Sequence, residues 1–427
     1  MKRQRITAPT GMHDILPDMQ PYYKKVYKAL EDIADFYDFQ KIDTPIVEQL
    51  ELFEKGTGSS TDVVQKQMYS FKTKGGDTLA LRPEFTPGIC RSYIEHGMFN
   101  LPQPVKVWFY GPLFRYERPQ AGRYRQFNQC GFEIIGDENP VIDAQVIQIF
   151  YNLLKELKFK NLMIEINSIG DNQCRPYYKK SLANYFKYRE AQLCSDCRRR
   201  LKENPLRILD CKEEKCQRIK SQAPQMIDYL CEGCKSHFKK VLEFLDELEL
   251  PYHLNPFLVR GLDYYTKTVF EIFEDSKGTE GVNLNSALVG GGRYDALIKV
   301  LFGKDTPACG GAAGVERIVE SLKEKIKGFS VSNPKFFLAQ LGTMAKRKSL
   351  RLIEELRVEK IKIAETLGRD SLKTQLRTAG RIGVDYALIL GQREALEDTI
   401  IIRNMATGKQ DTVKLNKAVA EIKKRIK

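Results

Sequence analysis

The segment 109–136 constrains the chain most, because it places two apolar β-type runs on either side of an arginine-rich loop. The loop carries Glu117 and four arginines, Arg115, Arg118, Arg123 and Arg125. A guanidinium is a planar fork of donors that matches phosphate oxygens, and its charge does not titrate away at physiological pH. Such a hairpin can hold a triphosphate against the floor of a sheet; the alternative is a charged hairpin that is only solvated.

Length and hydropathy bound the kinds of protein that this chain can form. With 427 residues it is long enough for two or three domains, each with its own core. No apolar run approaches the ~20 residues that a membrane helix needs, and the first residues lack the apolar core of a secretion signal. We therefore expect a cytoplasmic protein with no membrane partner.

Positive charge is concentrated in the last quarter of the chain. Residues 331–427 contain 21 Lys and Arg against 11 Asp and Glu, so they carry +10 of the total charge of +14. Such an excess favours contacts with the phosphates of a nucleic acid. The alternative is that the basic residues serve solubility alone.

Periodic patterns predict the elements of the first 170 residues. Apolar residues recur at helical spacing over 17–39. The segment 41–50 is extended in character and contains Pro45, which suits a sheet edge or a subunit contact. Further predictions are a hairpin over 68–82, a helix over 143–157 and a strand over 162–169.

Composition changes after residue 170. Residues 171–250 are mostly helical in pattern, charged and cysteine-rich, and strand character returns at Tyr252, which indicates an inserted helical module. The chemistry would then lie in 1–170 and 251–325. A second boundary falls in 325–335, where Gly, Ser, Asn and Pro interrupt the pattern. Beyond it we predict a compact α/β domain over 331–427, with strands FFLAQL, KIAETL, YALILG and TIIIRN and helices over 346–358, 371–383 and 414–427.

Two short segments carry side chains suited to binding a small charged molecule. Glu84 and Thr86 follow a strand that stops at Pro83, and they can accept the protons of an ammonium group, although such a pair also serves as a helix cap. In the segment 258–266, Arg260 opens an otherwise apolar strand and must find an anionic partner or stay hydrated. Its alternative role is a structural ion pair with Asp263.

A third segment is rich in glycine. We predict a turn over 290–295, followed by small residues over 310–317 that lead into a helix. Small residues let a flat base or sugar approach the backbone closely, and Arg317 adds a cation there. The spacing fits neither GxGxxG nor GxxxxGK[ST], which excludes dinucleotide-binding and P-loop assignments.

Nucleophilic catalysis by serine or cysteine and a histidine-built zinc hydrolase are both poorly supported. The chain has four histidines, and none lies in the arginine loop or in the segments around Glu84, Arg260 and Arg317. Phosphate chemistry would therefore depend on positioning and electrostatics.

Taken in order, these segments resemble the class II aminoacyl-tRNA synthetases, and among them the histidyl-tRNA synthetase family along nearly the full length. The specific markers are the loop RYERPQAGRYRQF, the segment VRGLDYYT and GGGRYD. The helix over 17–39 with the Pro45 strand resembles the dimer-forming motif 1 of that class, the Arg115 hairpin resembles motif 2, and 314–317 resembles motif 3.

The resemblance implies an α+β fold. It would have an antiparallel sheet with flanking helices in a catalytic domain over 1–325, a helical insertion over 171–250, and a C-terminal α/β anticodon-binding domain over 331–427. It also implies a homodimer and a ligase reaction in which L-histidine and ATP, with Mg²⁺, give histidyl-adenylate and pyrophosphate. The histidyl group then passes to the 3′ end of tRNA(His).

The resemblance also assigns roles by matching position. Arg115 would grip the α-phosphate, and Arg260 would neutralise charge as the histidine carboxylate attacks it, which makes these two the catalytic residues. The other ATP-binding residues would be Glu117 at the adenine amino group, Arg123 at the terminal phosphates and Arg317 on the far side of the nucleotide. Histidine would be bound by Glu84, Thr86 and Gln129 at its amino and carboxylate end, by Arg260, and by Glu133, Tyr264 and Tyr294 at the imidazole, with Tyr265 alongside. No residue of this site is assigned as a metal ligand.

Two other functions are compatible with such a fold. Paralogues of this synthetase serve as catalytically inactive regulatory subunits in histidine biosynthesis, but they typically lack the anticodon domain and the VRGLDYYT segment. A nucleic-acid sensor built on an inactive synthetase fold would not need Arg115, Arg260 and Glu84. The sequence therefore favours the enzyme.

Six cysteines of the predicted insertion fall in three pairs, Cys194 and Cys197, Cys211 and Cys216, and Cys231 and Cys234. Their spacings suit tetrahedral thiolate coordination in a cytosolic protein, so we hypothesise one structural Zn²⁺. The alternative is reduced thiols packed in a helical module. The resemblance does not decide between them, because the family does not need a metal there.

Overall fold

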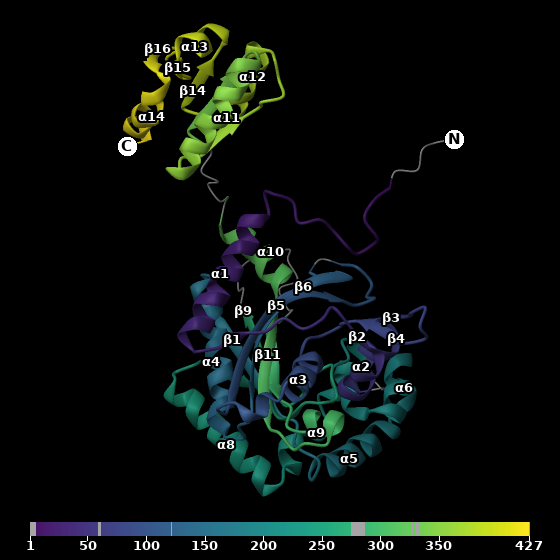
Figure 1. The fold of residues 1–427 in the computed structure, drawn as a ribbon. Helices are drawn as coiled ribbons and strands as arrows, with labels where there is room; N and C mark the ends of the chain where they lie inside the picture. Colours follow the sequence, from purple (N-terminus) through teal and green to yellow (C-terminus); the bar gives the residue numbers. More distant parts are fainter. Residues whose placement is uncertain are drawn as a thin grey trace, which may run out of the picture. The chain divides into compact units, whose positions relative to one another are not determined.

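The computed structural model describes residues 6–58, 61–120, 122–274, 287–326, 328 and 334–426 (Figure 1). The chain forms two compact units, Met1–Lys327 and Gly328–Lys427. Most of the boundary expected over 325–335 lies outside the described residues. No helix in the described part of the chain combines the length and apolar character needed to cross a bilayer.

The first unit is built on one large, mainly antiparallel sheet. Only β1 on β5 and β8 on β7, at the two ends of the sheet, pair in parallel. The other neighbours are antiparallel. In spatial order the strands are β1 (Gln40–Lys41), β5 (Val105–Phe114), β6 (Gln126–Ile135), β11 (Ala308–Gly314), β10 (Val289–Arg293), β9 (Thr266–Glu274), β7 (Leu162–Ser168) and β8 (Tyr252–Leu254).

Helices cover both faces of this sheet. On one face α4 packs across β6, β9, β10 and β11, and Phe132 of β6 meets Phe150 of α4 edge to face. On the other face Phe109 of β5 stacks on Phe85, beside α3 and α9. The helices of this part are α1 (Gln20–Phe36), α2 (Leu50–Thr57), α3 (Thr86–Glu95), α4 (Pro140–Glu156), α9 (Leu297–Phe302) and α10 (Val315–Lys325).

Outside the glycine-rich segment over 290–295, the helices and strands described for the first 170 residues are confirmed with small changes of bounds. The helix expected over 17–39 is α1, and the strands β5 and β6 flank the arginine loop. The extended segment around Pro45 forms β1 and β2, each at the edge of a sheet. The hairpin over 68–82 appears in a three-stranded sheet of β2 (Val47–Gln49), β4 (Thr78–Leu81) and β3 (Tyr69–Lys72).

The turn predicted over 290–295 is wrong. Gly290, Gly291 and Gly292 lie in β10, paired with β11 on one side and β9 on the other. A Cβ on Gly290 would overlap the guanidinium of Arg260. These glycines therefore stay extended and leave room for a close approach of side chains and backbone, which is a recognised use of glycine inside a strand.

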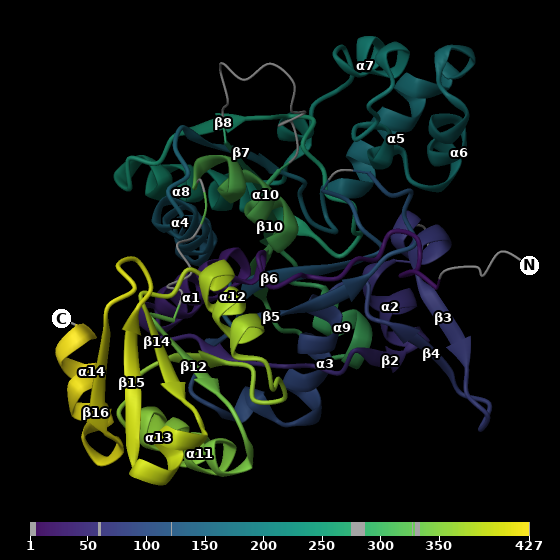
Figure 2. The ribbon, with the colours of Figure 1, turned by 90° about the horizontal axis from the view of Figure 1, so that it is seen from above.

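The segment between β7 and β8 is helical, as expected. It contains α5 (Arg175–Lys187), α6 (Ser195–Glu203), α7 (Glu214–Lys220) and α8 (Glu232–Glu247). In Figure 2 the first three cluster together, whereas α8 runs beside α4. His237 of α8 contacts Asp143 of α4 at 3.2 Å, which ties the last helix of this segment to the body of the sheet.

The second unit is an α/β domain with its own core. Its sheet has the order β13 (Ile363–Glu365), β12 (Phe336–Gln340), β14 (Tyr386–Leu390), β15 (Thr399–Asn404) and β16 (Gln410–Lys414). The four predicted strands are confirmed. β16 and the short helix α13 (Gln392–Glu397) were not predicted, because their sequences show no clear periodic pattern of apolar residues. The other helices are α11 (Thr343–Val358), α12 (Leu372–Ile382) and α14 (Ala418–Ile426), which starts later than the predicted residue 414 because β16 extends to Lys414.

Candidate active site

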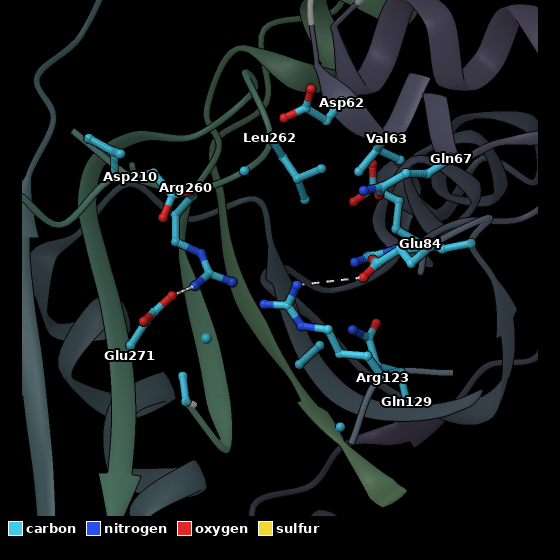
Figure 3. Close-up of a pocket in the computed structure, with 18 of the residues that line it drawn as sticks. Asp62, Val63, Gln67, Glu84, Arg123, Gln129, Asp210, Arg260, Leu262 and Glu271 are labelled. Carbon is cyan, nitrogen blue, oxygen red and sulfur yellow. Dashed lines mark hydrogen bonds and ion pairs between the residues drawn. The ribbon is translucent and has the colours of Figure 1, made fainter. Parts of the chain in front are cut away.

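A cavity of about 590 Å³ opens beside the central strands of the large sheet (Figure 3). Arg260 and Arg123 extend into it from opposite sides. Ten of the twelve predicted site residues line it: Glu84, Thr86, Arg115, Glu117, Arg123, Gln129, Arg260, Tyr264, Tyr265 and Arg317. Residues from segments more than 200 positions apart therefore share one cavity.

Glu133 and Tyr294 lie just behind this lining rather than on it, within the described part of the chain. Thr86 Oγ1 donates to Glu133 Oε1 at 2.8 Å, and the Tyr294 hydroxyl donates to Glu133 Oε2 at 2.6 Å. Burial raises the pKa of Glu133 to about 8, although both donors favour its charged form. The Glu133 carboxyl therefore exchanges its proton near neutral pH.

The strand geometry explains how Glu133 comes to face the cavity. Along β6, Phe132 points toward α4, so its neighbours Gly131 and Glu133 point to the opposite face. On the adjacent strand, a Cβ at Gly310 would overlap the Glu133 carboxylate. Gly310 therefore provides the space that a buried carboxyl needs between two strands.

Glu84 forms a second buried acidic group. Its Oε1 accepts a hydrogen bond from the Thr57 hydroxyl, and its Oε2 accepts one from the Tyr264 hydroxyl at 2.8 Å. Only 4% of Glu84 is exposed, and burial raises its pKa. Thr57, the last residue of α2, was not predicted; nothing in its sequence context indicates that α2 would deliver a hydroxyl here.

Arg260 is held against the sheet by an ion pair with Glu271 of β9. Burial alone would lower the pKa of Arg260, but Glu271 and the neighbouring tyrosines raise it on balance. Its Nε is buried and has no hydrogen-bond partner among the described residues. The partner that the structure gives Arg260 is thus Glu271, a strand residue that was not predicted from the sequence.

The other arginines form a positive wall. Arg115 donates from Nε to Pro83 O at 2.9 Å, and Arg317 donates to Gly122 O at 3.2 Å and Ala287 O at 2.9 Å. Burial and the nearby Arg123 and Arg115 lower the pKa of Arg317. Glu117, 3.9 Å from Arg123, and Glu271, which acts to raise the pKa of Arg317, offset part of this charge. The cluster of guanidinium groups suits an anionic ligand.

The helical segment closes one side of the cavity. Asp62, before the π-helical turn Val63–Gln67, receives hydrogen bonds from Arg200 at 2.9 Å and from Arg207 at 3.2 Å. Arg207 in turn donates to Gly261 O at 2.5 Å, next to Arg260. Asp62, Arg200 and Arg207 were not predicted from the sequence, because contacts between distant segments leave no local pattern.

The cysteines of the same segment form two clusters instead of one. Cys194, Cys197, Cys211 and Cys216 place their sulfur atoms within 4.8 Å of one another. Cys231 and Cys234 do not join them; they meet Asp171 and Cys174, which sequence analysis did not predict as ligands.

Comparison with known proteins gives first the class and then the family. Residues 335–425 match the family described as "Anticodon binding domain". With the antiparallel sheet and the arginine-lined cavity, this places the chain among the aminoacyl-tRNA synthetases of class II. Residues 11–173 and 180–318 match the family "Histidyl-tRNA synthetase". The chain belongs to the histidyl-tRNA synthetase family, and the predicted fold and family are confirmed.

Individual relatives agree with this assignment over almost the whole length. A histidine–tRNA ligase of Dehalococcoides mccartyi is 45% identical over 98% of this chain and 99% of its own. One from Desulfitobacterium hafniense is 42% identical over 95% of each chain. The crystal structure of apo Staphylococcus aureus histidyl-tRNA synthetase superposes with a TM-score of 0.78 at 35% identity, covering 98% of this chain and 100% of that one.

Proposed function

We propose that this protein is a histidine–tRNA ligase, which forms histidyl-adenylate from L-histidine and ATP and then esterifies tRNA(His). The observation that carries the proposal is the pair of buried carboxyls, Glu84 on the lining of the cavity and Glu133 directly behind Thr86 of that lining, in the same site as the arginine wall. Acidic acceptors suit an amino acid with an ammonium group and an imidazole. The arginines suit the phosphates of a nucleotide.

The two carboxyls have different tasks in this proposal. Glu84, with Thr86 and Gln129, binds the amino and carboxylate end of histidine. Glu133 and Tyr294 bind the imidazole, with Tyr264 and Tyr265 beside them. An imidazole N–H provides the donor that the ionised form of Glu133 requires. A site that leaves such groups unpaired would reject apolar amino acids by ~10⁴-fold or more.

The nucleotide occupies the arginine side. Arg115 binds the α-phosphate, Glu117 the adenine amino group, Arg123 the terminal phosphates and Arg317 the opposite side of the nucleotide. Mg²⁺ enters with ATP as part of the substrate and screens the phosphate charge.

The first step needs no side-chain base, because the histidine carboxylate is already a nucleophile. It attacks the α-phosphorus, a new O–P bond forms, and the bond to pyrophosphate breaks. Arg260 neutralises the charge that the two reactants bring together, and its position in the lining of the cavity supports this role. In the second step a terminal ribose hydroxyl of the tRNA attacks the histidyl carbonyl, and AMP leaves.

The second unit is proposed to bind the anticodon arm. Its basic excess suits a polyanionic partner. We also propose a cytoplasmic homodimer joined through α1 and the Pro45 segment, where Phe36 is 80% exposed and Ile46 is 42% exposed. Light scattering of the purified protein would measure its mass, and a monomeric mass would overturn the dimer.

One structural zinc ion is proposed on the cluster of Cys194, Cys197, Cys211 and Cys216. Cys194 Sγ and Cys211 Sγ lie 3.9 Å apart, and two backbone amides point at sulfur: Cys194 N donates to Cys216 Sγ at 3.3 Å, and Cys197 N to Cys194 Sγ at 3.4 Å. Such donors stabilise thiolates, which are the ligand form of cysteine.

A single assay tests the enzymatic proposal. Pyrophosphate exchange measured with each of the twenty amino acids should proceed with histidine and stay near background with the others. Exchange with a different amino acid would overturn the specificity assignment. No exchange with any of them would favour the inactive regulatory paralogue, although the matched anticodon domain and Arg260 argue against that function.

A further inference from the structure

The cluster of Asp171, Cys174, Cys231 and Cys234 has the dimensions of a second metal site. Cys174 Sγ and Cys234 Sγ lie 3.9 Å apart. Asp171 Oδ1 lies 3.4 Å from Cys174 Sγ and 4.0 Å from Cys231 Sγ. Around a zinc ion with Zn–S bonds of ~2.3 Å, the edges of a tetrahedron are ~3.8 Å between two sulfurs and ~3.6 Å between sulfur and oxygen. The observed separations match these edges.

Backbone amides support the two residues that open the cluster. Asp171 Oδ1 accepts hydrogen bonds from Gln173 N at 2.9 Å and Cys174 N at 3.3 Å, and Asp171 N donates to Cys174 Sγ at 3.3 Å. Ligating carboxylates in metalloproteins are held by such hydrogen bonds. Gly170, before Asp171, adopts φ +63°, and a Cβ there would meet Met226 and Cys174, so the chain turns tightly into the cluster.

The four residues come from two places that the fold brings together. Asp171 and Cys174 follow β7 and lead into α5, whereas Cys231 and Cys234 stand at the start of α8. The cluster thus lies where the chain leaves the sheet after β7, and it joins that point to the start of α8. Cys174 and Cys234 are buried, and Asp171 and Cys231 are partly exposed, which leaves a path for an ion.

From this geometry we propose that Asp171, Cys174, Cys231 and Cys234 bind a second zinc ion, independent of the cluster around Cys194. Three thiolates and one carboxylate supply four ligands of the types that Zn²⁺ binds, enough to complete a tetrahedral structural site. This site goes beyond the ligase function and would stand or fall separately from it.

The ion would hold the start of α5 and the start of α8 together, next to the part of the cavity that is proposed to bind histidine. Arg175, immediately after the cluster, donates to Tyr265 O at 2.6 Å and to Gly170 O at 2.9 Å. Tyr265 lines the cavity. The metal would therefore stabilise the turn over 170–174, and the hydrogen bonds of Arg175 link this turn to Tyr265.

Zinc content of the full-length protein, purified under reducing conditions, tests the proposal. We expect two zinc ions per chain in the natural protein. Cys174→Ser and Cys197→Ser should each retain one, and the double variant none. Cys90→Ala, which removes a buried cysteine outside both clusters, should retain two. An unchanged zinc content in Cys174→Ser, or a natural protein whose zinc is lost entirely in Cys197→Ser, would overturn the second site.

X-ray absorption at the zinc edge provides a test without any substitution. Two sites together offer seven sulfur ligands and one oxygen ligand, so the spectrum should contain sulfur at ~2.3 Å and an oxygen contribution at ~2.0–2.2 Å. The milder variant Asp171→Asn should release one of its two ions to a chelator faster than the natural protein. A spectrum with four sulfurs per zinc and no oxygen would contradict the Asp171 ligand.

Discussion

Tyr294 donates a hydrogen bond of 2.6 Å to Glu133 Oε2 beneath the floor of the cavity. Tyr294 follows β10 and Glu133 lies on β6, so the contact spans the intervening strand β11. The pKa of Glu133 is still raised to about 8, because burial outweighs the donors Tyr294 and Thr86 and because Glu84 lies nearby. Ionisation of Glu133 therefore costs free energy unless a ligand supplies a hydrogen-bond donor or a positive charge.

The pH dependence of stability should report this cost. The unfolded chain releases the Glu133 proton near 4.5, whereas the folded protein keeps it until about 8. The stabilising contribution is thus fully present below about 4.5 and is lost as the pH rises through 8. Without histidine, the natural protein should lose stability relative to Glu133→Gln between pH 5 and 9, by on the order of a few kcal/mol.

Denaturant unfolding of both proteins at several pH values measures this difference. The variant serves as the matched control, because its amide is isosteric with the carboxyl and does not titrate. Stability curves that stay parallel over the whole range would show that Glu133 titrates normally.

Arg260→Ala should slow adenylate formation by ~10²-fold or more while ATP binding changes little, because a donor to the transition state is lost. Histidine-dependent pyrophosphate exchange measures the rate, and equilibrium titration measures ATP binding. Arg218→Ala, which removes an exposed guanidinium of α7, should exchange normally. An unchanged exchange rate in Arg260→Ala would remove this residue from the proposed mechanism.

A chain ending at Ile326 should keep pyrophosphate exchange and lose most tRNA charging. The two units have separate cores, and the lining of the cavity lies entirely in the first. The lost unit carries most of the net positive charge, which favours contacts with phosphates. Exchange and charging should be measured on the same preparation; full charging by the shorter chain would give the second unit another task.

Arg293→Met should destabilise the protein by about 3–5 kcal/mol, because it leaves a buried carboxylate without its main partner. Arg293 is fully buried and donates to Asp143 Oδ2 from Nε at 3.0 Å and from Nη2 at 2.5 Å. Replacing both residues, with Asp143→Leu as the second change, should recover part of the loss. Thermal unfolding measures all three proteins, and an unchanged melting temperature in Arg293→Met would contradict the prediction.

Prediction from the sequence worked best where a local pattern repeats. The helical spacing of Val26, Leu30 and Ile33 anticipated α1, and the apolar runs around the arginine loop anticipated β5 and β6. It failed at Gly290, where glycine was interpreted as a turn although the strand needs it to make room for Arg260. Glycine is required at position 290 because the Arg260 side chain packs against its backbone, and nothing in the sequence around Gly290 indicates that contact.

The sequence by itself determined the family, the main elements and the residue types able to bind a nucleotide and an imidazole, because these depend on local periodicity and on motifs contiguous in the chain. Only the tertiary structure decided which partner each charge has: Glu271 for Arg260, Thr57 for Glu84, and Asp171 and Cys174 for the last cysteine pair. Burial and contact between distant segments set these pairings, and both are properties of the folded chain.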